Sequence, residues 1–75
     1  MIRIAVAEAQ TITRWALRAA LTNTPGMQVV ADAGTVADAL AMLQTHKPDV
    51  LLLDMTLAGH DALTEIRELE ARVAE

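Results

Sequence analysis

The chain contains no cysteine and no serine, and Trp15 is its only aromatic residue. Without cysteine it can form neither a disulfide bond nor a thiolate zinc site. The absence of both residue types also excludes a serine or cysteine nucleophile. Neither G-x-x-x-x-G-K-[ST] nor G-x-G-x-x-G occurs, so the glycine-rich loops that cradle nucleotide phosphates are missing too.

Basic residues are scarce as well. Six Lys and Arg against ten Asp and Glu give a net charge of −4, and the basic residues are scattered. We therefore expect no direct nucleic-acid binding, because phosphate neutralisation needs clustered cations. The apolar residues 1–7 are too few for a signal peptide or a membrane span, so we expect no membrane association. Together with the missing cysteines, this favours the cytoplasm.

The 75 residues allow one small domain, 1–75, and their apolar pattern predicts three strand–helix units in succession. The expected strands are 2–7, 27–31 and 50–53. Thr11, Thr35 and Asp61 are expected to cap the helices that follow them. A repeated strand–helix order predicts right-handed crossovers and a parallel sheet, which defines an α/β fold.

Helical spacing predicts which faces are buried. The first helix is expected to turn toward the sheet an apolar stripe made of Ile12, Trp15, Ala16, Ala19 and Ala20, widened by Leu17 and Leu21. Arg14 and Arg18 would then take its opposite face. The second helix is expected to bury Val36, Ala39, Leu40 and Leu43, and the third Leu63, Ile66, Leu69 and Val73. His46 and Lys47 are expected to end the second helix.

Two acidic residues stand at the carboxyl ends of predicted strands. Glu8 follows the first strand, and Asp54 follows Val50–Leu53, a run expected to be buried on both faces. If these strands are neighbours, the two carboxylates converge and repel each other unless a cation or a proton relieves them. Oxygen ligands favour Mg²⁺, Mn²⁺ or Ca²⁺, and a carboxylate beside Mg²⁺ can accept a phosphoryl group. The alternative is an aspartate that only caps a turn.

These residues resemble the response-regulator receiver domain of two-component signalling, in the branch that usually carries a C-terminal helix-turn-helix. The resemblance extends over the whole chain and is most specific at residues 48–54, with Gly59 and Asp61 after them. It is supported by residues 2–8 and by Arg14. It implies a partial flavodoxin-like, three-layer (βα)3 fold with a parallel sheet and the strand order 2-1-3.

The resemblance also implies roles for individual residues. Asp54 would be the phosphoacceptor in a phosphorelay, taking its phosphoryl group from the phosphohistidine of a histidine kinase. Mg²⁺ would be held by Asp54, Glu8 and the main-chain carbonyl of Thr56. Ala9 stands where the family has a second acid, and Leu57-Ala58-Gly59 stands where it usually has Met-Pro-Gly, so Mg²⁺ is expected to bind weakly or not at all. The chain itself would be no enzyme, but part of a transcriptional regulator.

The number of units differs from that of the family. Receivers have about five strand–helix units, so we expect a truncated domain, either a piece of a longer regulator or a minimal relative. Without a fourth strand the third becomes an apolar edge, which predicts a homodimer or larger oligomer formed through it. Two other functions are open. One is a degenerate receiver that acts as a phosphorylation-independent dimerisation or interaction module. The other is a small metal-dependent phosphatase, for which no general acid is evident.

Overall fold

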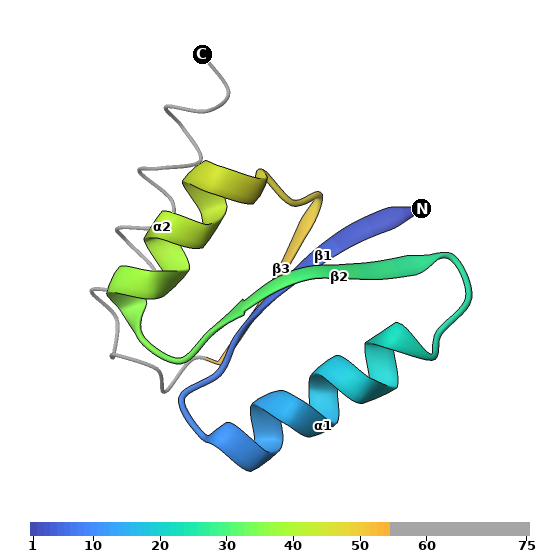
Figure 1. Cartoon of the computed structure of the whole chain (residues 1–75), viewed down its shortest axis with the longest axis horizontal. Helices are drawn as coiled ribbons and strands as arrows, with labels where there is room; N and C mark the ends of the chain where they lie inside the picture. Colours follow the sequence, from blue (N-terminus) through green and yellow to red (C-terminus); the bar gives the residue numbers. More distant parts are fainter. Residues whose placement is uncertain (55–75) are drawn as a thin grey trace.

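The computed structural model describes residues 1–54 as a parallel three-stranded sheet with one helix on each face (Figure 1). In chain order the elements are β1 (Ile2–Ala7), α1 (Thr11–Thr22), β2 (Met27–Ala33), α2 (Val36–His46) and β3 (Val50–Leu53). The strand order β2-β1-β3 confirms the predicted α/β class and the 2-1-3 order of a partial flavodoxin-like fold. The predicted third helix, with Asp61 as its cap, lies outside the described residues.

The core is built around β1, the central strand. Residues 4–7 are each at most 4% exposed. Ala5 and Ala7 pack in one cluster with Ala39 and Met42 of α2. Because successive side chains of a strand point to opposite faces, these two alanines lie on one face and leave room for α2 to approach closely.

The face that α1 turns toward the sheet differs from the prediction. The exposed residues include all five members of the expected stripe: Ile12, Trp15, Ala16, Ala19 and Ala20. Leu17 and Leu21, which were expected to widen the stripe, are half-buried, and so is Arg14, which was expected on the opposite face. Arg14 and Arg18 both pair with Asp32 on β2, so the arginine side of the helix also meets the sheet.

The ends of the two helices agree only partly with the prediction. The residue that caps α1 is Gln10 and not Thr11, and its side chain makes no capping hydrogen bond. The cap of α2 is confirmed, because Oγ1 of Thr35 accepts the main-chain N–H of Asp38 at 3.1 Å. The helix ends at His46 as expected, and Lys47 follows in the left-handed conformation with φ 45°.

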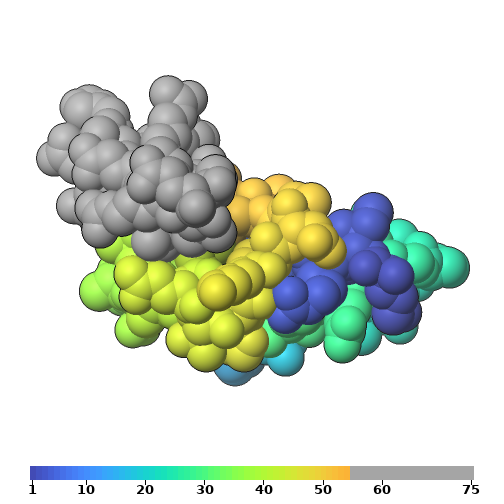
Figure 2. Space-filling model, turned by 90° about the horizontal axis from the view of Figure 1, so that it is seen from above, coloured from blue at the N-terminus to red at the C-terminus, as the bar shows by residue number. Residues whose placement is uncertain are grey.

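Arg3 joins the end of α2 to the start of β1. Its guanidinium donates to the carbonyls of His46 at 2.7 Å and Lys47 at 3.0 Å, which gives partners to carbonyls that a helix end leaves unpaired. The main chains of Arg3 and Asp49 are also linked, because the Asp49 N–H donates to the Arg3 carbonyl at 2.9 Å. Figure 2 shows these yellow and blue segments side by side. These bonds hold the loop that leads into β3.

The second strand is longer than predicted. β2 continues to Ala33, whereas the sequence had assigned Asp32 and Ala33 to a turn. Asp32 pairs with Val6 and Ala33 with Ala7, after a register shift between Ile4 and Ala5 of β1. Pairing with the central strand therefore outweighs the turn preference of an Asp-Ala-Gly sequence.

The third strand is less buried than predicted. Val50 is 46% exposed and Leu52 is 40% exposed, while Leu51 and Leu53 pack partly against the alanine cluster. Within residues 1–54, α1 contacts β1 and β2 but not β3. The face of β3 that carries Val50 and Leu52 is therefore not covered by the first helix. The prediction of a strand buried on both faces was wrong for this part of the chain.

Candidate acidic site at the carboxyl ends of the strands

Glu8 follows β1 and is held in place by three hydrogen bonds. Its main-chain N–H donates to the carbonyl of Ala33 at 3.0 Å. Its carbonyl accepts from Nη1 of Arg14 at 2.9 Å, and its carboxylate oxygen Oε1 accepts the N–H of Gln10 at 3.1 Å. Glu8 is 8% exposed, and within residues 1–54 it is the one buried charged residue. A buried carboxylate fixed in this way has a well-defined place at the end of the central strand.

Asp54 lies directly after β3, on the neighbouring strand. Its main-chain N–H donates to the carbonyl of Ala7 at 2.9 Å, and Ala7 is paired with Leu53. The structure thus brings the main chain of Asp54 beside the residue that precedes Glu8, at one edge of the sheet. The convergence of the two carboxylates stays a prediction. Thr56, the third predicted ligand, lies outside the described residues.

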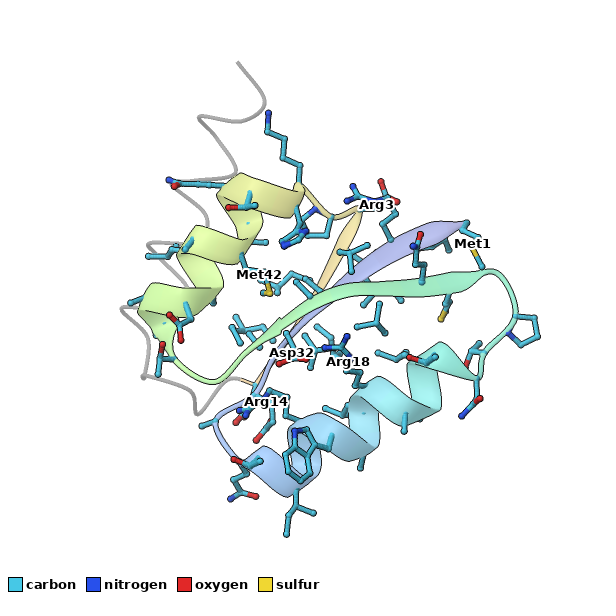
Figure 3. The ribbon with its side chains drawn as sticks, viewed as in Figure 1. Met1, Arg3, Arg14, Arg18, Asp32 and Met42 are labelled. Atoms are coloured by element: carbon cyan, nitrogen blue, oxygen red, sulfur yellow. The ribbon has the colours of Figure 1, made fainter. Side chains whose placement is uncertain are left out.

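A third acidic residue lies at the same edge, and the sequence analysis missed it as part of the site. Asp32 stands opposite Val6 near the end of β2. Its carboxylate is 3.5 Å from Nε of Arg14 and also pairs with Nη1 of Arg18 (Figure 3). Two guanidinium groups offset its charge, so Asp32 is occupied by ion pairs. The four-residue spacing of the two arginines was a signal, but only the fold shows which acid they reach.

The donor set at this edge fits a hard divalent cation. Glu8 and Asp54 offer carboxylate oxygens, and Mg²⁺ is often bound by only one or two carboxylates together with waters. Ala9, exposed beside Glu8, contributes no side-chain oxygen. Within residues 1–54 no three acidic or histidine side chains are grouped so that they could hold a metal ion. Carboxylates at this end of the sheet are the donor type that Mg²⁺ binds, and residues 1–54 supply no group of three such ligands that would form a protein cage.

Comparison with known proteins confirms the family that the sequence resembles. A family model described as "Response regulator receiver domain" matches residues 4–74. The match covers all three acidic residues at the strand ends, Glu8, Asp32 and Asp54.

The similar proteins include regulators and an enzyme. The "DNA-binding transcriptional activator DevR/DosR" of Mycobacterium tuberculosis is 29% identical over 75 residues, which are 100% of this chain and 35% of that protein. "Response regulator GacA" of Pseudomonas aeruginosa is 32% identical over 69 residues, 92% of this chain and 32% of that protein. A "Protein-glutamate methylesterase/protein-glutamine glutaminase 1" of Oleidesulfovibrio alaskensis is 35% identical over 69 residues, 92% of this chain and 19% of that enzyme. The chain thus spans between 19% and 35% of the length of these relatives.

Proposed function

Because the chain belongs to the response regulator receiver domain family, we propose that Asp54 accepts a phosphoryl group in two-component signalling. The observation that carries this proposal is the place of Asp54. It follows β3, and its main-chain N–H donates to Ala7, the last residue of the strand that buried Glu8 follows. Ligands of open α/β sheets bind beyond the carboxyl ends of the strands, which is where Asp54 lies. In the transfer, an Asp54 carboxylate oxygen bonds to phosphorus as the bond from phosphorus to a kinase histidine breaks. The products are an acyl phosphate and a free imidazole.

Receiver domains generally bind Mg²⁺ at their acidic pocket, and we assign it here to Glu8, Asp54 and the carbonyl of Thr56. Bound Mg²⁺ supplies positive charge that offsets the charge on the phosphoryl oxygens. Asp54 supplies the nucleophilic oxygen, and Glu8 supplies a carboxylate that its three hydrogen bonds hold at the strand end. With Ala9 in place of a second acid, the site carries less negative charge, so we propose that it binds Mg²⁺ weakly.

The wider setting is part of the same proposal. Two of the relatives are named as a transcriptional activator and a response regulator, so we place this chain in a transcriptional regulator that is not itself an enzyme and that receives phosphate from a histidine kinase. We assign DNA binding to no part of this chain, because its few basic residues are scattered. Neither of the two described helices is long and apolar enough to cross a membrane. The absence of cysteine supports a cytoplasmic location.

A small phosphodonor tests the function directly. The chain incubated with Mg²⁺ and acetyl phosphate should gain the mass of one phosphoryl group, with acetate as the leaving group. The modification should be acid-stable and base-labile, as expected of an acyl phosphate. No mass gain at any Mg²⁺ concentration would contradict the proposal and leave a module that works without phosphate.

A phosphorylation-independent interaction module is the second candidate, and the exposure of β3 favours it. Within residues 1–54, β3 is an edge strand, and its residues Val50 and Leu52 are 46% and 40% exposed. The N–H and C=O groups of an uncovered edge strand can pair with a strand of another chain. We propose that two copies of this chain pair through β3 as a homodimer, with Asp54 near the shared edge.

Replacing Leu52 by lysine should dissociate this homodimer. A charge placed on the shared edge must be desolvated for the strands to pair, so the dissociation constant should rise by roughly 100-fold or about 2.7 kcal/mol. Gln28→Lys is the matched control, because Gln28 is an exposed residue of β2, the opposite edge strand. Sedimentation at micromolar concentration measures both. A folded wild-type species with the mass of one chain would contradict the homodimer.

A further inference from the structure

Arg14 lies where three segments meet, although the sequence pattern had placed it on the solvent face of its helix. Its side chain is 17% exposed and extends from α1 to the ends of β1 and β2 (Figure 3). Nη1 donates to the main-chain carbonyl of Glu8 at 2.9 Å, and Nε lies 3.5 Å from the carboxylate of Asp32. Within residues 1–54, Arg14 is the side chain that both hydrogen-bonds to Glu8 and pairs with Asp32.

The fold leaves room for this guanidinium at Gly34. A Cβ atom at that position would stand 2.5 Å from Nη1 and 3.3 Å from Cζ of Arg14. Such separations are closer than van der Waals contact, so any larger residue would displace the guanidinium. The main chain of Gly34 does not have a positive φ, and the need for glycine here is one of space. The loop after β2 and the side chain from α1 therefore fit each other.

Arg18 shows what Arg14 does in addition to pairing with an acid. Both arginines belong to α1 and both pair with Asp32. The side chain of Arg18 is 49% exposed and is not bonded to Glu8, whereas Arg14 donates to the Glu8 carbonyl. The next link is the N–H of Gln10, which donates to the Glu8 carboxylate. The bond from Arg14 thus fixes the main chain of residues 8–10, and this main chain holds the Glu8 carboxylate through the Gln10 N–H.

We propose that Arg14 is a positioning residue for the acidic site, which fixes the turn 8–10 and thereby the Glu8 carboxylate. It also takes up the charge of Asp32, which keeps that carboxylate from competing for a cation at the same edge. Arg14 itself touches neither the phosphoryl group nor the cation in this assignment. The consequence for Mg²⁺ rests on the proposed function, but the consequence for the geometry of Glu8 does not.

The geometry is tested by amide hydrogen exchange in the 75-residue chain. Arg14→Gln should speed exchange of the Gln10 N–H, the donor to Glu8, by about tenfold while the amides of β1 keep their rates. Gly34→Ala should do the same by displacing the guanidinium, and Arg14→Lys, which keeps a donor for the Glu8 carbonyl, should exchange more slowly than Arg14→Gln. Arg18→Gln is the matched control and should leave Gln10 unchanged. Equal exchange at Gln10 in Arg14→Gln and Arg18→Gln would overturn the proposal.

The effect on the cation is measured by calorimetric titration with Mg²⁺ alone. Groups that orient a metal ligand typically change affinity by about 10- to 100-fold, so Arg14→Gln and Gly34→Ala should weaken Mg²⁺ binding by about tenfold or more. Arg18→Gln should stay close to the wild type. Unchanged affinity in Arg14→Gln would overturn the role toward the cation. A wild-type chain that binds no Mg²⁺ would contradict the proposed metal site instead, and the exchange of Gln10 would then decide the inference.

Discussion

Asp54→Asn should abolish phosphorylation of the chain by acetyl phosphate. Asparagine keeps the size of the side chain and the main-chain N–H that donates to Ala7, so the end of β3 should stay in place. Its amide has no carboxylate oxygen to attack phosphorus, so no acyl phosphate can form. Intact-mass measurement should show complete loss of the phosphorylated species, a larger effect than we expect from any other single substitution.

Asp38→Asn is the matched control for this substitution. Asp38 is an exposed acid in the first turn of α2, and the hydrogen bond that involves its main-chain N–H survives the change. This variant should be phosphorylated as the wild type is. A phosphoryl group that persists in Asp54→Asn would show that another carboxylate is the acceptor, and Glu8 and Asp32 at the same edge would be the first to examine.

Ala9→Asp should strengthen Mg²⁺ binding on the order of tenfold, which corresponds to about 1.4 kcal/mol of binding free energy. Ala9 is exposed next to buried Glu8, so a longer side chain there meets no packed core. The added carboxylate supplies another oxygen ligand and another negative charge at the edge where Asp54 lies. Titration calorimetry of the variant and the wild type measures the difference.

The same variant should behave in the opposite way when Mg²⁺ is removed. Three carboxylates close together repel one another without a cation, so Ala9→Asp should lower the midpoint of thermal unfolding in a chelator and raise it when Mg²⁺ is added. Ala9→Asn is the control of similar shape without the charge, and it should show neither change. Equal Mg²⁺ affinity in Ala9→Asp and Ala9→Asn would mean that this edge of the sheet is not arranged as a receiver pocket.

The order of the elements and their parallel pairing could be predicted from the sequence because the signals are local. The apolar runs of β1 and β3, the cap made by Thr35 and the helix end at His46 each depend on residues a few positions apart. The strand–helix succession then leaves little choice of topology, because crossovers between parallel strands are right-handed. The resemblance to receivers implied that the strands before Glu8 and Asp54 are neighbours, and the pairing of β1 with β3 confirms it.

The burial of side chains was harder to predict. The predicted apolar stripe of α1 was right for Leu17 and Leu21 but wrong for its five other members, because a stripe describes what a helix can bury and not what its neighbours cover. The burial of β3 was overestimated for the same reason. Val50 and Leu52 are apolar enough for a core, but α1 makes no contact with β3. The hydrophobic pattern of a strand does not show which of its residues a neighbouring helix covers. Apolar residues that stay exposed are therefore recognised only from the packed structure.

By itself, the amino-acid sequence determined the class of fold and the two acids at the strand ends, since these depend on short-range periodicity, capping and chain direction. The strand order was an implication of the resemblance to receivers. Only the tertiary structure decided that Asp32 belongs to the same edge and that Arg14 turns inward. Their ion pair joins α1 to β2. The position of Asp32 depends on the register of β2 against β1, which shifts between Ile4 and Ala5, and no local sequence pattern encodes that shift. The pairing of β2 with β1 brings Asp32 within reach of the two arginines, and their ion pairs join that side of α1 to the sheet.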